Sequence, residues 1–174
     1  MSHETADALA QFWQVAQRYA GFNGLEPFMR TSWSDIVPPP AWSFGDSPAV
    51  AEELLALVLD GRKTATSGLL ESYEPCEPVP KAGDLSIVLD GAGMPQALIR
   101  AVEVKVLPFA AVTERQAGAE GEGDGSLASW RQAHREAWRR QGYDVTDDSQ
   151  VVWERFEVLY PHTPRPLVQS FWPR

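Results

Sequence analysis

Lys63 and Thr66 lie close together in the stretch GRKTAT, residues 61–66. A threonine hydroxyl is a poor nucleophile unless a neighbouring base accepts its proton. A lysine can act as that base only where desolvation lowers its pKa. The spacing therefore permits a nucleophile beside its activating base. It also fits an exposed lysine at a helix end followed by an ordinary strand threonine. The pattern alone favours this second interpretation.

Three acidic residues alternate with glycines in AEGEGDGS, residues 119–126. Their oxygen atoms could hold a hard cation, or one of them could act as an acid or base, or orient the lysine. The spacing by itself favours a solvated loop in which Asp124 or Ser126 caps the next helix. No EF-hand, CxxC, HExxH or GxxxxGK[ST] pattern occurs in the chain, so no recognised metal or phosphate motif is present.

Residues 127–141 carry four arginines and one acidic residue, although the formal net charge of the whole chain is −9. This basic surface could contact phosphates, but the solvated face of an amphipathic helix is the favoured interpretation. His134 shares the opposite, apolar face with Leu127, Trp130 and Trp138, and we expect it to be a packed or capping histidine. The four arginines are Arg131, Arg135, Arg139 and Arg140.

The elements that must position these groups follow from periodicity and from helix-stop and turn residues. Apolar residues at helical spacing predict helices, and short β-branched runs predict strands, with a bend or bulge in the longest one. The absence of an alternating strand–helix order predicts an α+β fold, a small curved sheet or barrel flanked by helices. Three helices are predicted: residues 4–20, the segment between its cap Ser47 and its stop Gly61, and residues 127–141. Four strands are predicted: one that begins at Thr64, and residues 85–89, 96–107 and 151–160.

Composition limits the classes of protein to consider. At 174 residues the chain is most simply one domain with a sizeable core. No apolar run approaches the roughly 20 residues that span a bilayer, and the single Cys76 fits a reducing cytosol, so we expect a cytoplasmic protein. The net charge of −9 argues against a long nucleic acid and favours a small ligand or a short, local contact.

Three stretches of the chain resemble the bacterial ASCH domain in order and spacing. The resemblance covers about residues 42–160, and it leaves 1–41 as an N-terminal helix with an irregular extension and 161–174 as a Pro-rich tail. It implies a small PUA-like β-barrel with a cavity beside the GRKT segment. The stretches are FGDSPAVAEELLALVLDGRKTATSGLL, KAGDLSIVL and AEGEGDGSLASWRQAHREAW.

The resemblance also implies a reaction. One small member of the family is an amidohydrolase that removes the acyl group from N4-acetylcytidine, and its catalytic Lys, Thr and Glu match Lys63, Thr66 and Glu122. We therefore expect amide hydrolysis through an acyl-threonine, with Lys63 as base and Glu122 orienting it or shuttling the proton. A longer member of the family is a ribonuclease. If this chain shared that activity, Lys63 would stabilise the phosphorane, and Glu120 or Glu122 would transfer protons or bind a metal. A non-catalytic RNA-binding module is the third possibility.

Substrate contacts and partners follow from the same reading. The guanidinium of Arg62 fits a phosphate or carbonyl, and the ring of Tyr73 fits base stacking. The chemistry requires no metal and no organic cofactor. We expect a modified nucleoside or short RNA as partner, no DNA and no membrane, and a monomer or homodimer. The remaining expected substrate contacts are Thr64, Glu120, Ser126 and Arg131.

Overall fold

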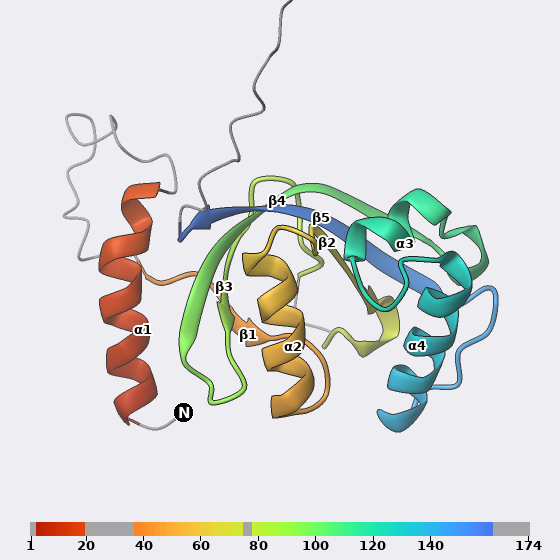
Figure 1. Cartoon of the computed structure of the whole chain (residues 1–174), viewed down its shortest axis with the longest axis horizontal. Coiled ribbons are helices and arrows are strands. Elements are labelled where there is room, and N and C mark those ends of the chain that lie inside the picture. The colour runs from red at the N-terminus through yellow and green to blue at the C-terminus, as the bar shows by residue number, and fades with distance from the viewer. Residues whose placement is uncertain (1–2, 20–36, 75–77, 162–174) are drawn as a thin grey trace, which may run out of the picture.

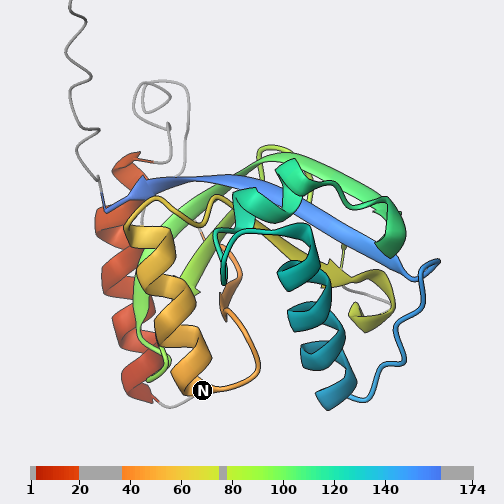
Figure 2. The same ribbon diagram turned by 45° about the vertical axis from the view of Figure 1, so that its right-hand side comes forward.

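Five strands form one curled sheet in the computed structural model, and helices flank it (Figures 1 and 2). The structure describes residues 3–19, 37–74 and 78–161. The strand order is β1-β3-β4-β5-β2, and the sheet curls into a half-barrel. β1 pairs with β3 in parallel, and the other neighbours are antiparallel. The strands are β1 Ala41–Ser43, β2 Ala65–Leu69, β3 Leu85–Leu89, β4 Pro95–Pro108 and β5 Gln150–Tyr160.

The helices lie on different parts of this sheet (Figure 1). The N-terminal helix α1 packs against β3 and β4, where Trp13 meets the buried Ile87 and Leu98. The predicted α+β fold with a PUA-like half-barrel and an N-terminal helix is therefore confirmed. The α-helices are α1 His3–Ala16, α2 Pro48–Leu59, α3 Glu114–Glu120 and α4 Leu127–Arg140, and the short 3-10 turns are η1 Gln17–Tyr19, η3 Leu70–Ser72 and η4 Phe109–Ala111.

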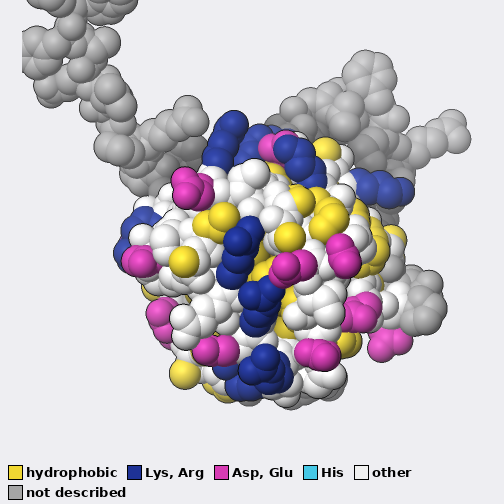
Figure 3. All heavy atoms as spheres, turned by 90° about the vertical axis from the view of Figure 1, so that its right-hand side faces the viewer, with side chains coloured by type: hydrophobic (Ala, Val, Ile, Leu, Met, Phe, Trp, Pro, Cys, Tyr) yellow, Lys and Arg dark blue, Asp and Glu magenta, His cyan; other side chains and the backbone are white. Residues whose placement is uncertain are grey.

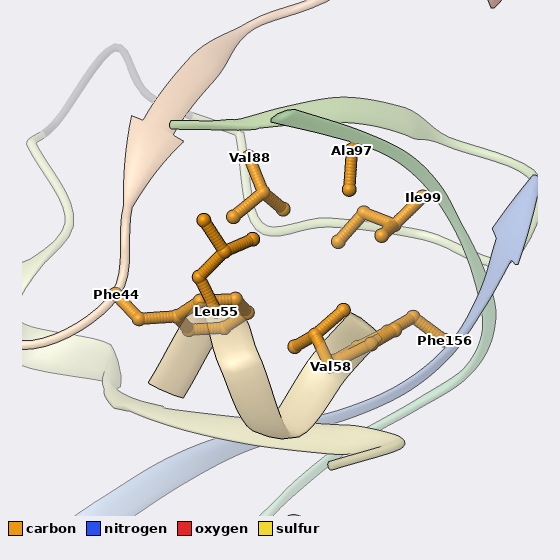
Figure 4. Close-up of a cluster of buried hydrophobic side chains, with 7 residues drawn as sticks. All are labelled: Phe44, Leu55, Val58, Val88, Ala97, Ile99 and Phe156. Carbon is orange, nitrogen blue, oxygen red and sulfur yellow. The ribbon is translucent and has the colours of Figure 1, made fainter. Parts of the chain in front are cut away.

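Helix α2 supplies one side of the main core. Ser47 caps its N-terminus by accepting a hydrogen bond from the amide of Val50, and Pro48 occupies its first turn. Its apolar side chains point toward β3, β4 and β5 (Figure 4). This cluster consists of Phe44, Leu55, Val58, Val88, Ala97, Ile99 and Phe156.

An aromatic cluster holds α4 against η4. The rings of Phe109 and Trp130 stack with centroids 5.2 Å apart, and Trp138 contacts Phe109 edge-on. His134 stacks on Trp130 at 4.2 Å. Because Phe109 and Trp130 are almost fully buried, this contact fixes the position of α4 and of the loop that precedes it.

Two local features differ from the sequence expectation. Residues 41–43, which lie outside the predicted strands, form the short strand β1, because their backbone pairs with β3. Residues 119–120, expected to lie in a loop, end helix α3, whose start is stabilised by a capping box between Thr113 and Gln116.

The predicted bulge appears as register shifts in β4. Residues 20–36 and the tail from 162 onward lie outside the described residues, and no described helix is long and apolar enough to cross a membrane.

Candidate active site

Lys63 lies at the junction where α2 ends and β2 begins. Gly61 ends the helix in a left-handed conformation (φ 74°), and the amides of Arg62 and Lys63 both donate to the carbonyl of Leu57, at 2.9 and 3.0 Å. This turn directs the Lys63 side chain inward, where it is 1% exposed. An ammonium group buried to this extent requires charged or polar partners.

The end of α3 docks onto the same junction. The amide and the hydroxyl of Thr64 both donate to the carbonyl of Ala119, at 2.8 and 3.0 Å. Gly121 follows with φ 67°, and its Cα lies against the backbone of Arg62. These contacts place Glu120 and Glu122, which flank Gly121, beside Lys63.

The Lys63 ammonium lies between two carboxylates. Its Nζ is 2.5 Å from Oε1 of Glu122 and 3.6 Å from Oε2 of Glu120, and 5.2 Å from the centroid of the Phe44 ring. The Glu122 side chain is 24% exposed, whereas those of Lys63 and Glu120 are about 1% exposed. Glu122 is therefore the member of the group that solvent or a substrate can reach.

Glu120 is held by protein groups on both oxygens. Its Oε1 accepts hydrogen bonds from Ser67 Oγ at 2.6 Å and Trp130 Nε1 at 2.7 Å. Its Oε2 faces Nε2 of His134 at 3.4 Å and Lys63 at 3.6 Å, without a closer hydrogen bond. Burial raises the pKa of Glu120, but the hydrogen bonds from His134 and Ser67 and the charges of His134 and Lys63 outweigh it and lower the pKa to about 2. Glu120 is ionised at neutral pH.

His134 connects this carboxylate to helix α4. Its Nδ1 is 3.0 Å from the carbonyl oxygen of Trp130, one turn earlier in the helix. A carbonyl oxygen can only accept, so Nδ1 donates to it, and the opposite nitrogen faces Glu120. The expected packed histidine is thus part of the polar network.

A cavity of about 460 Å³ opens beside these groups. Thr66 lies in its wall, and its hydroxyl has no hydrogen-bond partner among the described residues. No hydrogen bond joins Lys63 to Thr66 in the described part of the chain, because the ammonium is engaged by Glu122. The polar part of the lining comprises Thr66, Ser67, Glu120, Glu122 and His134.

The other expected substrate contacts are distributed differently. Arg62 is exposed and pairs with Asp60 at 3.2 Å. The Thr64 hydroxyl donates to the Ala119 carbonyl, as described above. Tyr73 lines a second, larger cavity that adjoins the first. Arg62 and Thr64 line neither cavity among the described residues.

Ser126 and Arg131 also have structural partners. Ser126 caps α4 through a hydrogen bond from the amide of Ser129 at 3.1 Å. Arg131 donates to the carbonyl of Ala110 at 2.9 Å. The first contact caps α4 and the second connects it to η4, and neither side chain lines either of the two cavities in the described structure.

Two of the four arginines of α4, Arg135 and Arg140, are paired with acidic side chains. Arg135 contacts Asp147 at 2.6 Å and lies over the Phe109 ring at 4.6 Å, and Arg140 contacts Asp46 at 2.8 Å. On the face at the right of Figure 1, basic and acidic side chains are interspersed (Figure 3). Among the described residues, Arg131 contacts only the neutral carbonyl of Ala110 and Arg139 has no ion-pair partner, so two of the four α4 arginines are neutralised by acidic side chains.

Sequence reasoning missed two members of the site, Ser67 and Trp130. Ser67 follows Thr66 in β2, where successive side chains point to opposite faces of a regular strand, yet both line the cavity. The spacing of Trp130 and His134 on one helical face was visible, but it indicated only core packing. Among the described residues, no three His, Cys, Asp or Glu side chains are arranged to hold a metal ion.

The fold and the site together define a PUA-like half-barrel with a buried lysine–carboxylate group beside a cavity. The ASCH domain matches residues 40–160, and the chain belongs to the ASCH domain family. Protein EF3133 from Enterococcus faecalis V583, of the family DUF984, is similar at 33% identity over 88% of each chain, with a TM-score of 0.70. An ASCH domain from Lactobacillus crispatus JV V101 is similar at 28% identity over 86% of this chain and 93% of that one, with a TM-score of 0.68. No curated protein matches the sequence.

Proposed function

We propose that this protein hydrolyses the amide of a small, uncharged acylated nucleoside of the N4-acylcytidine type. The observation that carries the proposal is the Lys63–Glu122 ion pair beside Thr66. The partly exposed carboxylate of Glu122 and the unpartnered hydroxyl of Thr66 line one cavity among the described residues. Membership of the ASCH domain family supports the same reaction, because Lys63, Thr66 and Glu122 resemble the catalytic residues of an amidohydrolase of that family.

The reaction proceeds in two steps, acylation of Thr66 and hydrolysis of the resulting ester. The Thr66 hydroxyl transfers its proton to the Lys63–Glu122 pair as its oxygen attacks the acyl carbon. The carbon–nitrogen bond breaks, the pair returns the proton to the leaving amine, and an acyl-threonine ester remains. Water then attacks this ester, which releases a carboxylic acid and restores the hydroxyl. Glu122 is the proton carrier that reaches the cavity, and Lys63 is its partner behind the wall.

The charges around the two cavities favour an uncharged substrate. Arg140 is the one Lys or Arg among the described residues of either lining, and it is already paired with Asp46. The smaller lining also contains the acidic residues Glu120 and Glu122, and the larger contains Asp84. A phosphate would meet a negative surface in both places, which argues against the ribonuclease. The ion pairs of Arg135 and Arg140 reduce the positive charge that α4 could offer to RNA phosphates, which favours the hydrolase over a non-catalytic RNA-binding module.

One experiment separates the three functions. Purified protein is incubated with N4-acetylcytidine and, separately, with mixed single-stranded RNA, and products are separated by chromatography and by gel. We expect cytidine and acetate from the nucleoside, intact RNA, and no turnover by Glu122→Gln. Cleaved RNA with unchanged nucleoside would establish the ribonuclease instead. Salt-sensitive RNA binding without any product would establish the binding module.

A further inference from the structure

A second cavity of about 710 Å³ adjoins the first along strand β2. The two linings share Trp42, Thr66, Ser67, Gly68 and Ser72. The larger cavity also has apolar walls from Pro39, Pro40, Tyr73 and Val152. A ligand that occupied both cavities would therefore pass beside Thr66.

Glu154 lies in the lining of this larger cavity without a partner among the described residues. It is on β5, with Thr66 of β2 and Val104 of β4 as its cross-strand neighbours. Its side chain is 8% exposed, and no hydrogen bond or ion pair to it is formed by any other described residue. Buried carboxyl groups are almost always hydrogen-bonded, so an unpartnered one that borders a cavity points to a ligand.

The surroundings of Glu154 favour its neutral form. Its neighbours on the adjacent strands, Thr66 and Val104, carry no charge. From the turn before β3 it faces Asp84, while Tyr73 lines the same cavity after η3, and no described Lys or Arg lines it. Burial, followed by the negative charge of Asp84, raises the pKa of Glu154 to about 7.

We propose that the larger cavity is a nucleobase subsite, in which the neutral carboxyl of Glu154 binds a ring-nitrogen acceptor and an adjacent N–H donor, as on the pairing edge of cytosine. The proposal deepens the proposed function and rests on it for the orientation of the acyl group. Trp42 and Tyr73 supply aromatic surface for the base.

The hydrogen-bonding pattern gives this subsite its selectivity. A neutral carboxyl group offers one O–H donor beside one carbonyl acceptor, which matches cytosine. Acylation of the exocyclic nitrogen leaves one N–H there, so the substrate keeps both contacts while its acyl group extends past Thr66 into the smaller cavity. An ionised carboxylate only accepts, and it matches instead the adjacent ring N–H and amino group of guanine.

The test is calorimetric titration of the intact protein with cytidine and with guanosine between pH 5.5 and 8.5. We expect cytidine affinity to fall by up to about tenfold per pH unit above pH 7, because binding holds one proton. Glu154→Gln should bind cytidine with no such pH dependence, since a carboxamide also presents a donor beside an acceptor. Glu154→Leu should lose cytidine binding while remaining folded by thermal unfolding.

Further variants guard the interpretation. Asp84→Asn should move the pH midpoint of cytidine binding to lower pH without abolishing binding, an effect that a merely structural role would not produce. Glu53→Gln, which removes an exposed charge on α2, should behave as wild type. A pH-independent wild type, or undiminished binding by Glu154→Leu, would overturn the proposal.

The outcome is separable from that of the proposed function. Glu122→Gln should fail to hydrolyse N4-acetylcytidine yet bind cytidine with the wild-type pH dependence, because Glu122 borders only the smaller cavity in the described structure. Hydrolysis together with pH-independent binding would contradict the Glu154 subsite but not the proposed reaction. Binding with the expected pH dependence but without hydrolysis would contradict the proposed reaction but not the subsite.

Discussion

Gly121 faces the carbonyl oxygen of Arg62 so closely that a Cβ atom at Gly121 would lie 2.4 Å from it. The backbone of Gly121 is also left-handed, with φ 67°. This contact sets the distance between the α3 terminus and the α2–β2 junction. It therefore determines whether Glu120 and Glu122 can both reach Lys63.

Gly121→Ala should lower stability and activity together. The left-handed conformation costs about 1–2 kcal/mol for a residue with a Cβ, and displacing backbone atoms adds to this. Gly125 is the matched control, since it has φ 74° and a Cβ atom at that position would have no described neighbour within 4 Å. Thermal unfolding should show a clearly larger loss for Gly121→Ala than for Gly125→Ala. Equal losses would mean that the close approach contributes nothing.

Thr66→Ala should abolish deacylation and leave the melting temperature nearly unchanged, because the hydroxyl has no described partner to lose. Thr66→Ser should keep part of the rate, since it retains a hydroxyl. Ser67→Ala is the comparison, because that hydroxyl also borders the cavity but donates to Glu120. Turnover of N4-acetylcytidine measures all three variants. Loss of activity in Ser67→Ala with a fully active Thr66→Ala would transfer the nucleophile to Ser67.

Glu120 and Glu122 should differ in what their replacement damages. The pKa of Glu120 is lowered to about 2 in the folded protein from 4.5, so its charge stabilises the fold above about pH 4.5, and this stabilisation is lost as the pH falls toward 2. Glu120→Gln should cost about 3 kcal/mol at pH 7 and progressively less in acid. Denaturant unfolding at several pH values measures this. Glu122→Gln should chiefly lose turnover, and a pH-independent cost for Glu120→Gln would contradict the assignment.

Lys63→Arg should be nearly inactive although it keeps the positive charge. The larger, planar guanidinium does not fit a site in which the lysine is 1% exposed, so it would displace Glu122, the proton carrier, from the cavity. Arg62→Lys, at the exposed neighbouring position, serves as the control and should retain activity. Steady-state rates on N4-acetylcytidine compare the two variants, after unfolding curves have confirmed that both are folded. An active Lys63→Arg would mean that the compact lysine head group is not needed to hold Glu122 in place.

Glu154 should destabilise the protein at neutral and alkaline pH. Its pKa rises from 4.5 to about 7 on folding, so the folded state holds its proton more tightly than the unfolded state does. This favours folding below about pH 4.5, and the advantage is lost as the pH rises through 7. The difference in free energy of unfolding between Glu154→Gln and wild type should therefore be more favourable to the variant at pH 8 than at pH 4, by up to about 3 kcal/mol. Urea unfolding at these two pH values measures the difference, and equal values would exclude a raised pKa.

Local sequence determined the elements of the fold. The cap at Ser47, the stop at Gly61 and the apolar, β-branched runs of β3 and β5 act within a few residues, so the helices α2 and α4 and most strands were predictable. Strand β1 was not, because three residues gain their strand conformation only by pairing with β3. The end of α3 was missed because its glycines and acids resemble a loop.

The site needed the tertiary structure. Residue types and resemblance pointed to Lys63, Thr66 and Glu122, but they left open whether the lysine was solvated. Its burial depends on contacts between segments more than fifty residues apart, namely the hydrogen bonds of Thr64 to Ala119 and the close approach of Gly121. The unpartnered carboxyl of Glu154 is likewise invisible in the chain, because only the curl of the sheet and the neighbouring Asp84 desolvate it and favour its proton in the described structure.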